Sequence, residues 1–375
     1  MSHEQDVIHA ITLTRIGFYN MAGMLDLLRR AGSATAIMEH SADIRQLVPD
    51  ASPRLVEAFR NSGDAAHRAE VEYAWAVEHG VRVLCYGSSD YPQRLNDCPD
   101  APLVLYYKGN ADPNQQRVIN IVGTRRCTVY GQDIIRRFVA DLRQLCPRVL
   151  IVSGLAYGVD ICAHRQALQQ GFETVGVLAH GLDDLYPTAH RDTAVQMLHQ
   201  GGLVTEFMTQ TRADKMNFVR RNRIVAGMTD ATLLIQSAAK GGGLITCDIA
   251  QNYGRDVFAF PGPVDVEECR GCNNLIRDNG AGLITSAEDF VNAVNWNDHR
   301  LLEATRMGIE RQLFPDLSAE EQTVVDVLSA TNDLQVNLLT VKTGIPISRL
   351  SALLFTLEMK GVVRSLAGGM YHLLK

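Results

Sequence analysis

The spacing of apolar residues divides the chain into a helical part, a mixed part and a second helical part. Over residues 1–80, apolar positions at helical intervals are broken by glycine and proline, which predicts a small domain of short helices. Over residues 81–294, short apolar runs alternate with amphipathic segments of helix length. This alternation predicts an α/β fold, with a mostly parallel sheet covered by helices on both faces.

The predicted strands are the β-rich apolar runs of this central part. They cover residues 81–85, 103–107, 118–122, 149–152, 174–178, 203–205, 232–235, 257–260 and 282–284. Ligands of parallel sheets collect beyond the carboxyl ends of the strands, where loops lead into helix N-termini. We therefore expect the functional residues in the loops that follow these runs.

The two ends of the chain predict smaller domains. Ile16-Gly17 gives the first domain a SAM-like or helix-hairpin-helix-like character, although a plain helical packing module fits equally well. Residues 295–317 lack a clear pattern and are predicted to be a linker. Ser318-Ala319-Glu320-Glu321 then has the signature of a capped helix start. Further helices at 338–342 and 347–360, followed by a hairpin turning at Gly368-Gly369, predict a winged helix over residues 318–375.

Composition limits the classes of function. The chain has 375 residues, 46% of them hydrophobic, which suits two or three domains with buried cores. The formal net charge of −6 argues against a general basic coat, but not against a local basic groove. Seven arginines against two aspartates lie between Arg117 and Arg148, and four arginines and one lysine against one aspartate lie between Arg212 and Arg223.

Eight cysteines are scattered without the spacing of a disulfide framework, and the N-terminus has no secretory signal pattern. These features predict a reduced, cytoplasmic protein. No apolar run approaches the ~20 residues that cross a bilayer, so no membrane span is expected. Cys269 and Cys272 form a CxxC motif without a second pair of ligands. The sequence therefore predicts neither a metal site nor a bound cofactor.

One segment concentrates basic and aromatic side chains, with Phe218, Arg220, Arg221, Asn222 and Arg223 within six residues. If it is helical, Arg221 and Asn222 follow Phe218 by three and four positions and share its face. Such a face can stack a base while it holds a phosphate. The alternative is an ordinary surface helix whose arginines are solvated.

Two glycine-containing loops add candidate backbone amides. Gly123-Thr124-Arg125 follows the run 118–122, where glycine lets the backbone approach a ligand and arginine adds a charge suited to phosphate. Lys240, Gly242 and Gly243 precede a helix whose N-terminus can cradle an anion. The GxGxxG fingerprint is absent and no P-loop motif is complete, which weakens a nucleotide-cofactor interpretation.

Two further loops carry acids near histidines. Asp160 and His164 have the spacing of a hydrogen-bonded or salt-bridged pair on one helix, and Asp183 and Asp184 suit a turn. Neither set includes an evident nucleophile or a metal ligand cluster. We therefore expect both sets to have structural rather than catalytic roles.

Together the motifs resemble those of the DNA processing protein A, or Smf, family over roughly residues 100–290. The matching residues are Ile121-Val122-Gly123-Thr124-Arg125 with Tyr130-Gly131; Ser153-Gly154-Leu155-Ala156 with Gly158, Asp160, Ala163-His164 and Ala167-Leu168; Gly181-Leu182-Asp183 with Tyr186-Pro187; Phe218 with Arg221-Asn222-Arg223-Ile224; Gly242 to Thr246; and Pro261-Gly262 with Asn274-Leu275-Ile276. The sequence departs from the family pattern at Val219, where proline is usual, and at Gly241-Gly242, where serine-glycine is usual.

The resemblance implies an extended Rossmann-like core that binds and protects single-stranded DNA, forms a homodimer and loads the RecA recombinase during natural transformation, without catalysis. It assigns phosphate contacts to Arg125 and Arg221, and base contacts to Phe218 and Asn222. It places Lys240 and Arg223 along a basic groove. It also agrees with a C-terminal winged helix, which could dock on duplex DNA or on protein.

Two alternatives remain open at this point. A nucleotide-processing enzyme resembling the lysine decarboxylase-like phosphoribohydrolases would share a glycine-rich Rossmann core, and would need a glutamate in its pocket, for which Glu206 is the candidate. A structural adaptor would instead bind its partner through residues 318–375 alone.

Overall fold

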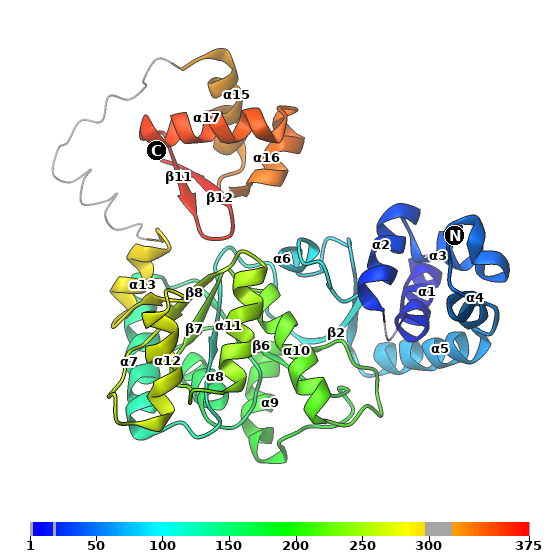
Figure 1. Cartoon of the computed structure of the whole chain (residues 1–375), viewed down its shortest axis with the longest axis horizontal. Coiled ribbons are helices and arrows are strands. Elements are labelled where there is room, and N and C mark those ends of the chain that lie inside the picture. Colours follow the sequence, from blue (N-terminus) through cyan, green and yellow to red (C-terminus); the bar gives the residue numbers. More distant parts are fainter. Residues whose placement is uncertain (1–2, 18–19, 297–316, 375) are drawn as a thin grey trace.

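The computed structural model of the protein describes residues 3–17, 20–296 and 317–374. A central sheet with flanking helices carries a group of helices on one side and a small domain at the C-terminal end (Figure 1). The predicted linker falls mostly on residues 297–316, and the turn after Ile16-Gly17 includes residues 18–19. Both lie outside the described residues, so these two interpretations stay predictions.

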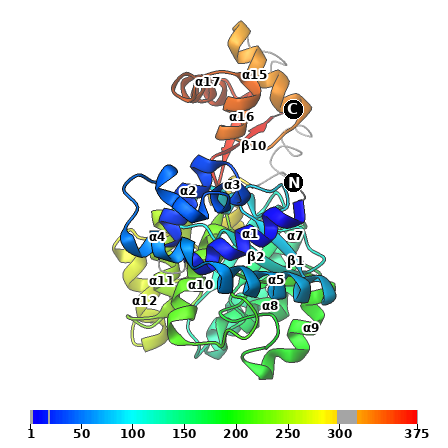
Figure 2. The same ribbon diagram turned by 90° about the vertical axis from the view of Figure 1, so that its right-hand side faces the viewer.

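The N-terminal part is helical, as the apolar spacing predicts. Its helices are α1 (His3–Ile16), α2 (Met21–Ala31), α3 (Ala34–Met38), α4 (Pro53–Arg60) and α5 (Gly63–Glu78), with a short 3-10 helix at Ser41–Gln46. Side chains at helix starts accept backbone N–H groups, as Ser33 and Ser52 do from residues three positions later. The helices lie beside the β1 edge of the sheet (Figure 2), and their apolar residues join one core with it.

Within the described residues the sheet has nine strands, one at each predicted run. They are β1 (Arg82–Cys85), β2 (Val104–Gly109), β3 (Val118–Val122), β4 (Leu150–Ser153), β5 (Thr174–Val177), β6 (Gly201–Thr205), β7 (Ala231–Leu234), β8 (Asp256–Ala259) and β9 (Gly282–Leu283). Their order is β1-β2-β6-β5-β4-β3-β7-β8-β9. Only the β1–β2 and β2–β6 pairs are antiparallel, so the prediction of a mostly parallel sheet is confirmed.

Helices cover both faces of this sheet. They are α6 (Gln93–Asn96), α7 (Val129–Leu145), α8 (Val159–Gln169), α9 (Arg191–His199), α10 (Lys215–Gly227), α11 (Gly242–Asn252), α12 (Glu267–Arg277) and α13 (Ala287–Ala293), with a 3-10 turn at Thr188–His190. Strands β3, β4, β5 and β7 are buried along their whole length, as expected for strands packed on both faces. Two separate apolar clusters result, one on each side of β3.

The C-terminal part is a winged helix, as predicted. It consists of α15 (Ala319–Ala330), α16 (Val336–Thr343), α17 (Ile347–Met359), β11 (Val363–Leu366) and β12 (Met370–Leu373). Ser318 and Glu321 form the expected capping box at the start of α15. The short strand β10 (Leu334–Gln335) was not predicted, because two residues are too few to show a periodic pattern.

Membrane-spanning helices and metal-binding clusters can be looked for only among the described residues. No single helix there has the length and apolar content to cross a membrane, although α16 and α17 together, bent by 108°, meet those criteria. No group of three or more His, Cys, Asp or Glu side chains in the described ranges is placed to hold a metal ion.

Candidate DNA-binding site

A cavity of about 760 Å³ opens at the carboxyl ends of β4, β3 and β7, which are neighbours in the sheet. The loops that leave these strands form its walls, together with α10 and the N-terminus of α11. Nine predicted site residues line it: Gly123, Thr124, Arg125, Phe218, Arg221, Asn222, Lys240, Gly242 and Gly243. The structure thus brings together residues that lie up to 120 positions apart in the sequence.

The loop after β3 is held from both sides. The backbone N–H of Thr124 donates to the carbonyl oxygen of Gln236 (2.8 Å), and the N–H of Val159 donates to the carbonyl oxygen of Thr124 (3.1 Å). A Cβ atom on Gly123 would lie 2.6 Å from the Gln236 oxygen, so only glycine fits between β7 and α8. These contacts fix the backbone while the side chain of Arg125 remains exposed at the cavity.

Helix α10 carries the aromatic side of the cavity. The side chain of Asp214 caps it by accepting the N–H of Asn217 (2.8 Å), so the helix begins just before the aromatic residue. The guanidinium carbon of Arg125 lies 4.8 Å from the ring centre of Phe218, and that of Arg221 lies 5.9 Å from it. The predicted convergence of these three side chains is therefore confirmed, in the geometry of cation–π contacts.

The expected surface position of Arg221 is wrong. Its side chain is only 3% exposed, and its Nη1 donates to the carbonyl oxygens of Gly154 (2.6 Å) and Val177. A Cβ atom on Gly154 would lie 2.4 Å from the guanidinium, so glycine makes room for it. Burial lowers the pKa of Arg221 to about 10, and the nearby Asp160 opposes that shift. The guanidinium remains charged at neutral pH and forms part of the cavity floor.

Asp160 and His164 do not form the predicted helix pair. The carboxylate of Asp160 accepts the backbone N–H groups of Gly154 (3.2 Å) and Ala156 (3.3 Å), which shapes the loop after β4. The ring of His164 bonds instead to the Thr174 hydroxyl (2.7 Å). Burial lowers the pKa of His164 to about 3, so the ring is neutral near pH 7 and has a packing role.

Arg220 and Arg223 lie away from the cavity, which corrects their predicted place along the groove. Both bind the buried carboxylate of Glu206, at 2.9 and 2.6 Å, and Arg223 also donates to the carbonyl oxygen of Asp100. Helical spacing explains the difference, because positions next to Phe218 and Arg221 point to other faces of α10. The same bonds remove Glu206 from the cavity wall, so the enzyme alternative loses its candidate carboxylate.

The N-terminus of α11 forms the opposite wall. Gly241 caps it without a side-chain hydrogen bond, and Lys240 is exposed beside it. A Cβ atom on Gly243 would lie 3.1 Å from the Cα atom of Gly123, so the two glycine-containing loops touch directly. Backbone amides, the positive end of the helix dipole and a lysine therefore meet at one place, an arrangement suited to an anion.

Tyr186 is a cavity residue that the sequence reasoning did not select. It follows β5 in the loop interpreted as a structural turn, and its ring centre lies 5.9 Å from that of Phe218. Its side chain is 46% exposed, so a ring face is accessible. The strand-end argument applied to the loops after β3 and β7 would also have found it, because β5 lies next to β4.

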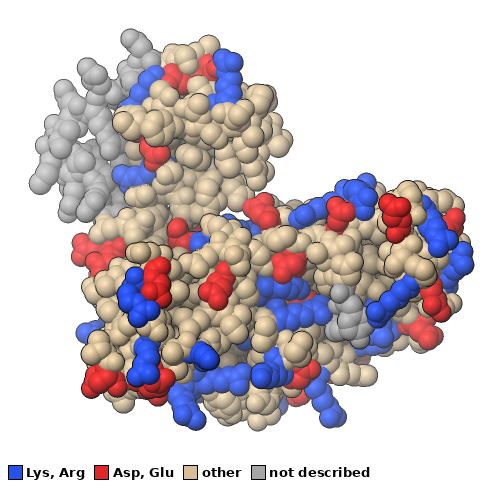
Figure 3. Space-filling model, in the orientation of Figure 1, with Lys and Arg blue, Asp and Glu red and all other residues tan. Residues whose placement is uncertain are grey.

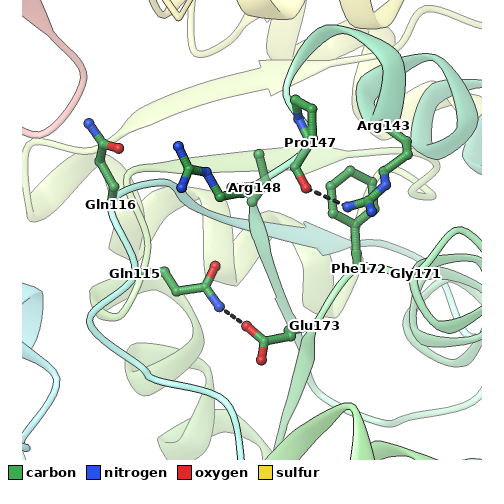
Figure 4. A pocket seen from close by; sticks show the side chains of 9 residues that line it. Gln115, Gln116, Arg143, Pro147, Arg148, Gly171, Phe172 and Glu173 are labelled. Carbon is green, nitrogen blue, oxygen red and sulfur yellow. Dashed lines mark hydrogen bonds between the residues drawn. The ribbon is translucent and has the colours of Figure 1, made fainter.

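A second hollow lies at the other end of the strands, before β4 and β5 (Figure 4). Some of its polar groups are already paired: Gln115 donates to Glu173, and Arg143 donates to the carbonyl oxygen of Pro147 and lies over the ring of Phe172 at 5.2 Å. Ligands of parallel sheets gather at the carboxyl ends instead.

The basic side chains visible on the lower half of the sheet domain (Figure 3) show that the charge of the whole chain does not describe its local surface.

Comparison with known proteins defines the family. Residues 82–295 match the model of DNA recombination-mediator protein A, and residues 310–369 match that of the DprA winged helix domain. The chain belongs to the DNA recombination-mediator protein A family. The resemblance deduced from the cavity motifs is thereby confirmed, and the matched range contains every predicted site residue.

Individual members of the family support this assignment. Protein Smf of Escherichia coli is 31% identical over 315 residues, covering 81% of this chain and 80% of that protein. The X-ray structure of DNA processing protein A from Streptococcus pneumoniae has a TM-score of 0.65 at 31% identity, covering 75% of this chain and 95% of the other. The structure of DNA processing protein A from Helicobacter pylori, which is described as binding single-stranded DNA, has a TM-score of 0.51 at 27% identity. The match covers 57% of this chain and 94% of the other.

In this member of the family, replacing Arg221 is expected to damage the fold as well as the cavity. Arg221→Glu would remove the hydrogen bonds to Gly154 and Val177 and bury a second carboxylate near Asp160. We expect a loss of roughly 3–5 kcal/mol in the free energy of unfolding, measured by urea denaturation. Arg126→Glu, at an exposed position, should change it by less than about 0.5 kcal/mol. Equal stability of the two variants would contradict this assignment.

Proposed function

We propose that the cavity binds single-stranded DNA, and the observation that carries this proposal is the convergence of the Phe218 ring with the guanidinium groups of Arg125 and Arg221. An aromatic ring offers a stacking surface to any unpaired base, worth about 1–3 kcal/mol. The guanidinium carbons of Arg125 and Arg221 lie within 6 Å of the centre of that ring, so positive charge suited to a phosphate lies beside the stacking surface. A paired base cannot reach such a surface, so the site favours single strands.

The remaining cavity residues take roles that follow from their chemistry. The exposed Arg125 and Lys240, from two neighbouring loops, neutralise phosphates, and the amides of Gly242 and Gly243 lie at the positive end of α11. The half-buried amide of Asn222 is placed to hydrogen bond a base edge. Glu206 is neutralised by two arginines outside the cavity. We therefore infer a binding role without catalysis for this protein.

The winged helix contributes little charge for a duplex. Arg349 pairs with Glu320 at 2.9 Å, and Lys360 pairs with the capping residue Glu321 at 2.7 Å. Exposed apolar side chains lie instead on α16 and α17, at Val341, Ile347, Phe355 and Met359. Ile347, Phe355 and Met359 follow one another at intervals of eight and four residues and so share one face of α17. Exposed apolar side chains favour a protein partner over phosphate, so we infer that this domain docks on protein.

Binding of an oligothymidylate should weaken steeply as salt is added, because each neutralised phosphate of a single strand contributes about 0.7 to the slope of log affinity against log salt. We expect a slope of about −2 from two to three phosphates, measured by fluorescence anisotropy. Arg125→Glu should lower affinity at least tenfold and reduce the slope. Lys342→Glu, which reverses the charge of a cation on α16, is the matched control. A slope near zero would rule out a phosphate-binding groove.

Removing the stacking ring should act without changing the salt dependence. We expect Phe218→Ala to weaken binding about 5- to 150-fold, the equivalent of 1–3 kcal/mol, and Tyr186→Ala to weaken it by less. Phe218→Tyr and Tyr186→Phe keep an aromatic face and should bind almost like the unchanged protein. Wild-type affinity of Phe218→Ala would show that the bases lie elsewhere.

We further propose that the protein acts in the cytoplasm as a homodimer that protects DNA entering during natural transformation and passes it to RecA. The support is the family membership together with a cavity open to an unpaired strand. The protein should speed RecA filament assembly on strands already coated by a single-strand binding protein, measured by light scattering. Arg125→Glu should abolish this effect. Sedimentation at a monomer mass, or assembly at an unchanged rate, would contradict the proposal.

A further inference from the structure

Two cysteines lie at the margin of the candidate DNA-binding cavity. Cys127 follows Arg125 by two residues in the loop after β3, and Cys162 lies in the first turn of α8. The hydrogen bond from Val159 N–H to the Thr124 carbonyl joins these two segments three residues before each cysteine. Helices α7 and α8, which follow the two segments, pack side by side (Figure 1).

The two thiols contact each other. The side chains of Cys127 and Cys162 lie close enough for each thiol to shift the pKa of the other, and both pack against the same apolar cluster while remaining partly exposed. The sulfur of Cys127 also lies 3.7 Å from the carbonyl oxygen of Thr128. Gly131 leaves room for them, because a Cβ atom there would lie 2.9 Å from the sulfur of Cys127. The other candidate pair, Cys269 and Cys272, is fully buried and has no comparable access.

Their environment also makes one of the thiols reactive. The pKa of Cys162 is lowered to about 7: the Cys127 thiol and, more weakly, Arg165 lower it, whereas burial and the Asp160 carboxylate raise it. The pKa of Cys127 is raised by the Cys162 thiol and by burial. Because the thiolate is the nucleophile, Cys162 is the attacking sulfur near neutral pH and Cys127 is the resolving thiol.

We propose that Cys127 and Cys162 form a reversible disulfide that controls the position of the Arg125 loop. The oxidant is a low-molecular-weight disulfide, such as oxidised glutathione. The Cys162 thiolate attacks one of its sulfurs, breaks the S–S bond and releases one glutathione thiolate. Cys127 then loses its proton and attacks the Cys162 sulfur, which releases the second glutathione. The protein loses two electrons and two protons, and the oxidant becomes two thiols.

The disulfide is expected to weaken the binding of single-stranded DNA because it shortens the distance between the two sulfur atoms. This expectation rests on the proposed function. A disulfide bond is about 2.05 Å long, much shorter than the distance between two unbonded thiol sulfurs, so its formation draws Cys127 towards α8. Arg125, two residues away, must then move relative to Phe218, which it overlies at 4.8 Å. We expect oxidation to lower the affinity for single strands at least threefold. By linkage, a bound strand should disfavour the disulfide by the same factor.

The disulfide is tested on the full chain without reference to DNA. The protein is equilibrated with oxidised and reduced glutathione, remaining thiols are alkylated, and peptides are mapped by mass spectrometry without reduction. We expect a crosslink between the peptides of Cys127 and Cys162 and a loss of two hydrogens, reversed by dithiothreitol. Cys127→Ser and Cys162→Ser should abolish it, with circular dichroism as the check of folding. Alkylation of both thiols after oxidation, or a persistent glutathione adduct, would overturn the proposal.

A matched variant and a binding assay complete the design. Cys85→Ser replaces another partly buried cysteine, in β1, whose pKa burial raises to about 12, and it should keep the crosslink. Oxidised protein should bind oligothymidylate at least threefold more weakly than reduced protein, and Cys127→Ser should show no such difference. Equal affinity of the crosslinked and reduced forms would overturn the control of the loop. Failure of the reduced protein to bind any strand would instead refute the proposed function and leave the mapped disulfide standing.

Discussion

The buried guanidinium of Arg221 is the interaction that joins the sheet to the cavity surface. It enters the floor of the cavity between the loop after β4 and the end of β5, whose carbonyl oxygens receive its hydrogen bonds. From there it supports the ring of Phe218 one turn earlier on α10. A charge without such partners would be costly to bury. The glycine at position 154 and the nearby Asp160 make its burial possible.

The positions of the strands along the chain and the fold class followed from the sequence because their causes are local. Buried strands need continuous apolar runs, and crossover helices need amphipathic segments between them, so both patterns are visible without tertiary contacts. The capping box at Ser318 was found for the same reason, and the helix assumed for the segment around Phe218 is present as α10. The site residues on the strand-end loops could also be predicted from the sequence, because the parallel topology places those loops together.

The burial of individual side chains and their ion-pair partners could not be predicted from the sequence in the same way. Nothing in the spacing of α10 says that Arg221 points to the sheet, or that Glu206 lies close enough to bind Arg220 and Arg223. Such pairings depend on contacts between segments that meet only after the chain has folded. The exposed ring of Tyr186 was overlooked because its loop was judged on its adjacent carboxylates.

The ion pairs with Glu206 reduce the number of positive charges that the segment between Arg212 and Arg223 presents at the surface. Its five cations suggest a strongly charged groove, but one glutamate binds two of them and a third is buried below the surface. Only Arg212 and Lys215 remain exposed there, so few charges reach a phosphate. In the proposed binding mode Arg125 and Lys240 supply the electrostatic attraction, and the aromatic surface supplies a further share of the affinity. Stacking accepts every base, and a site built in this way is independent of sequence.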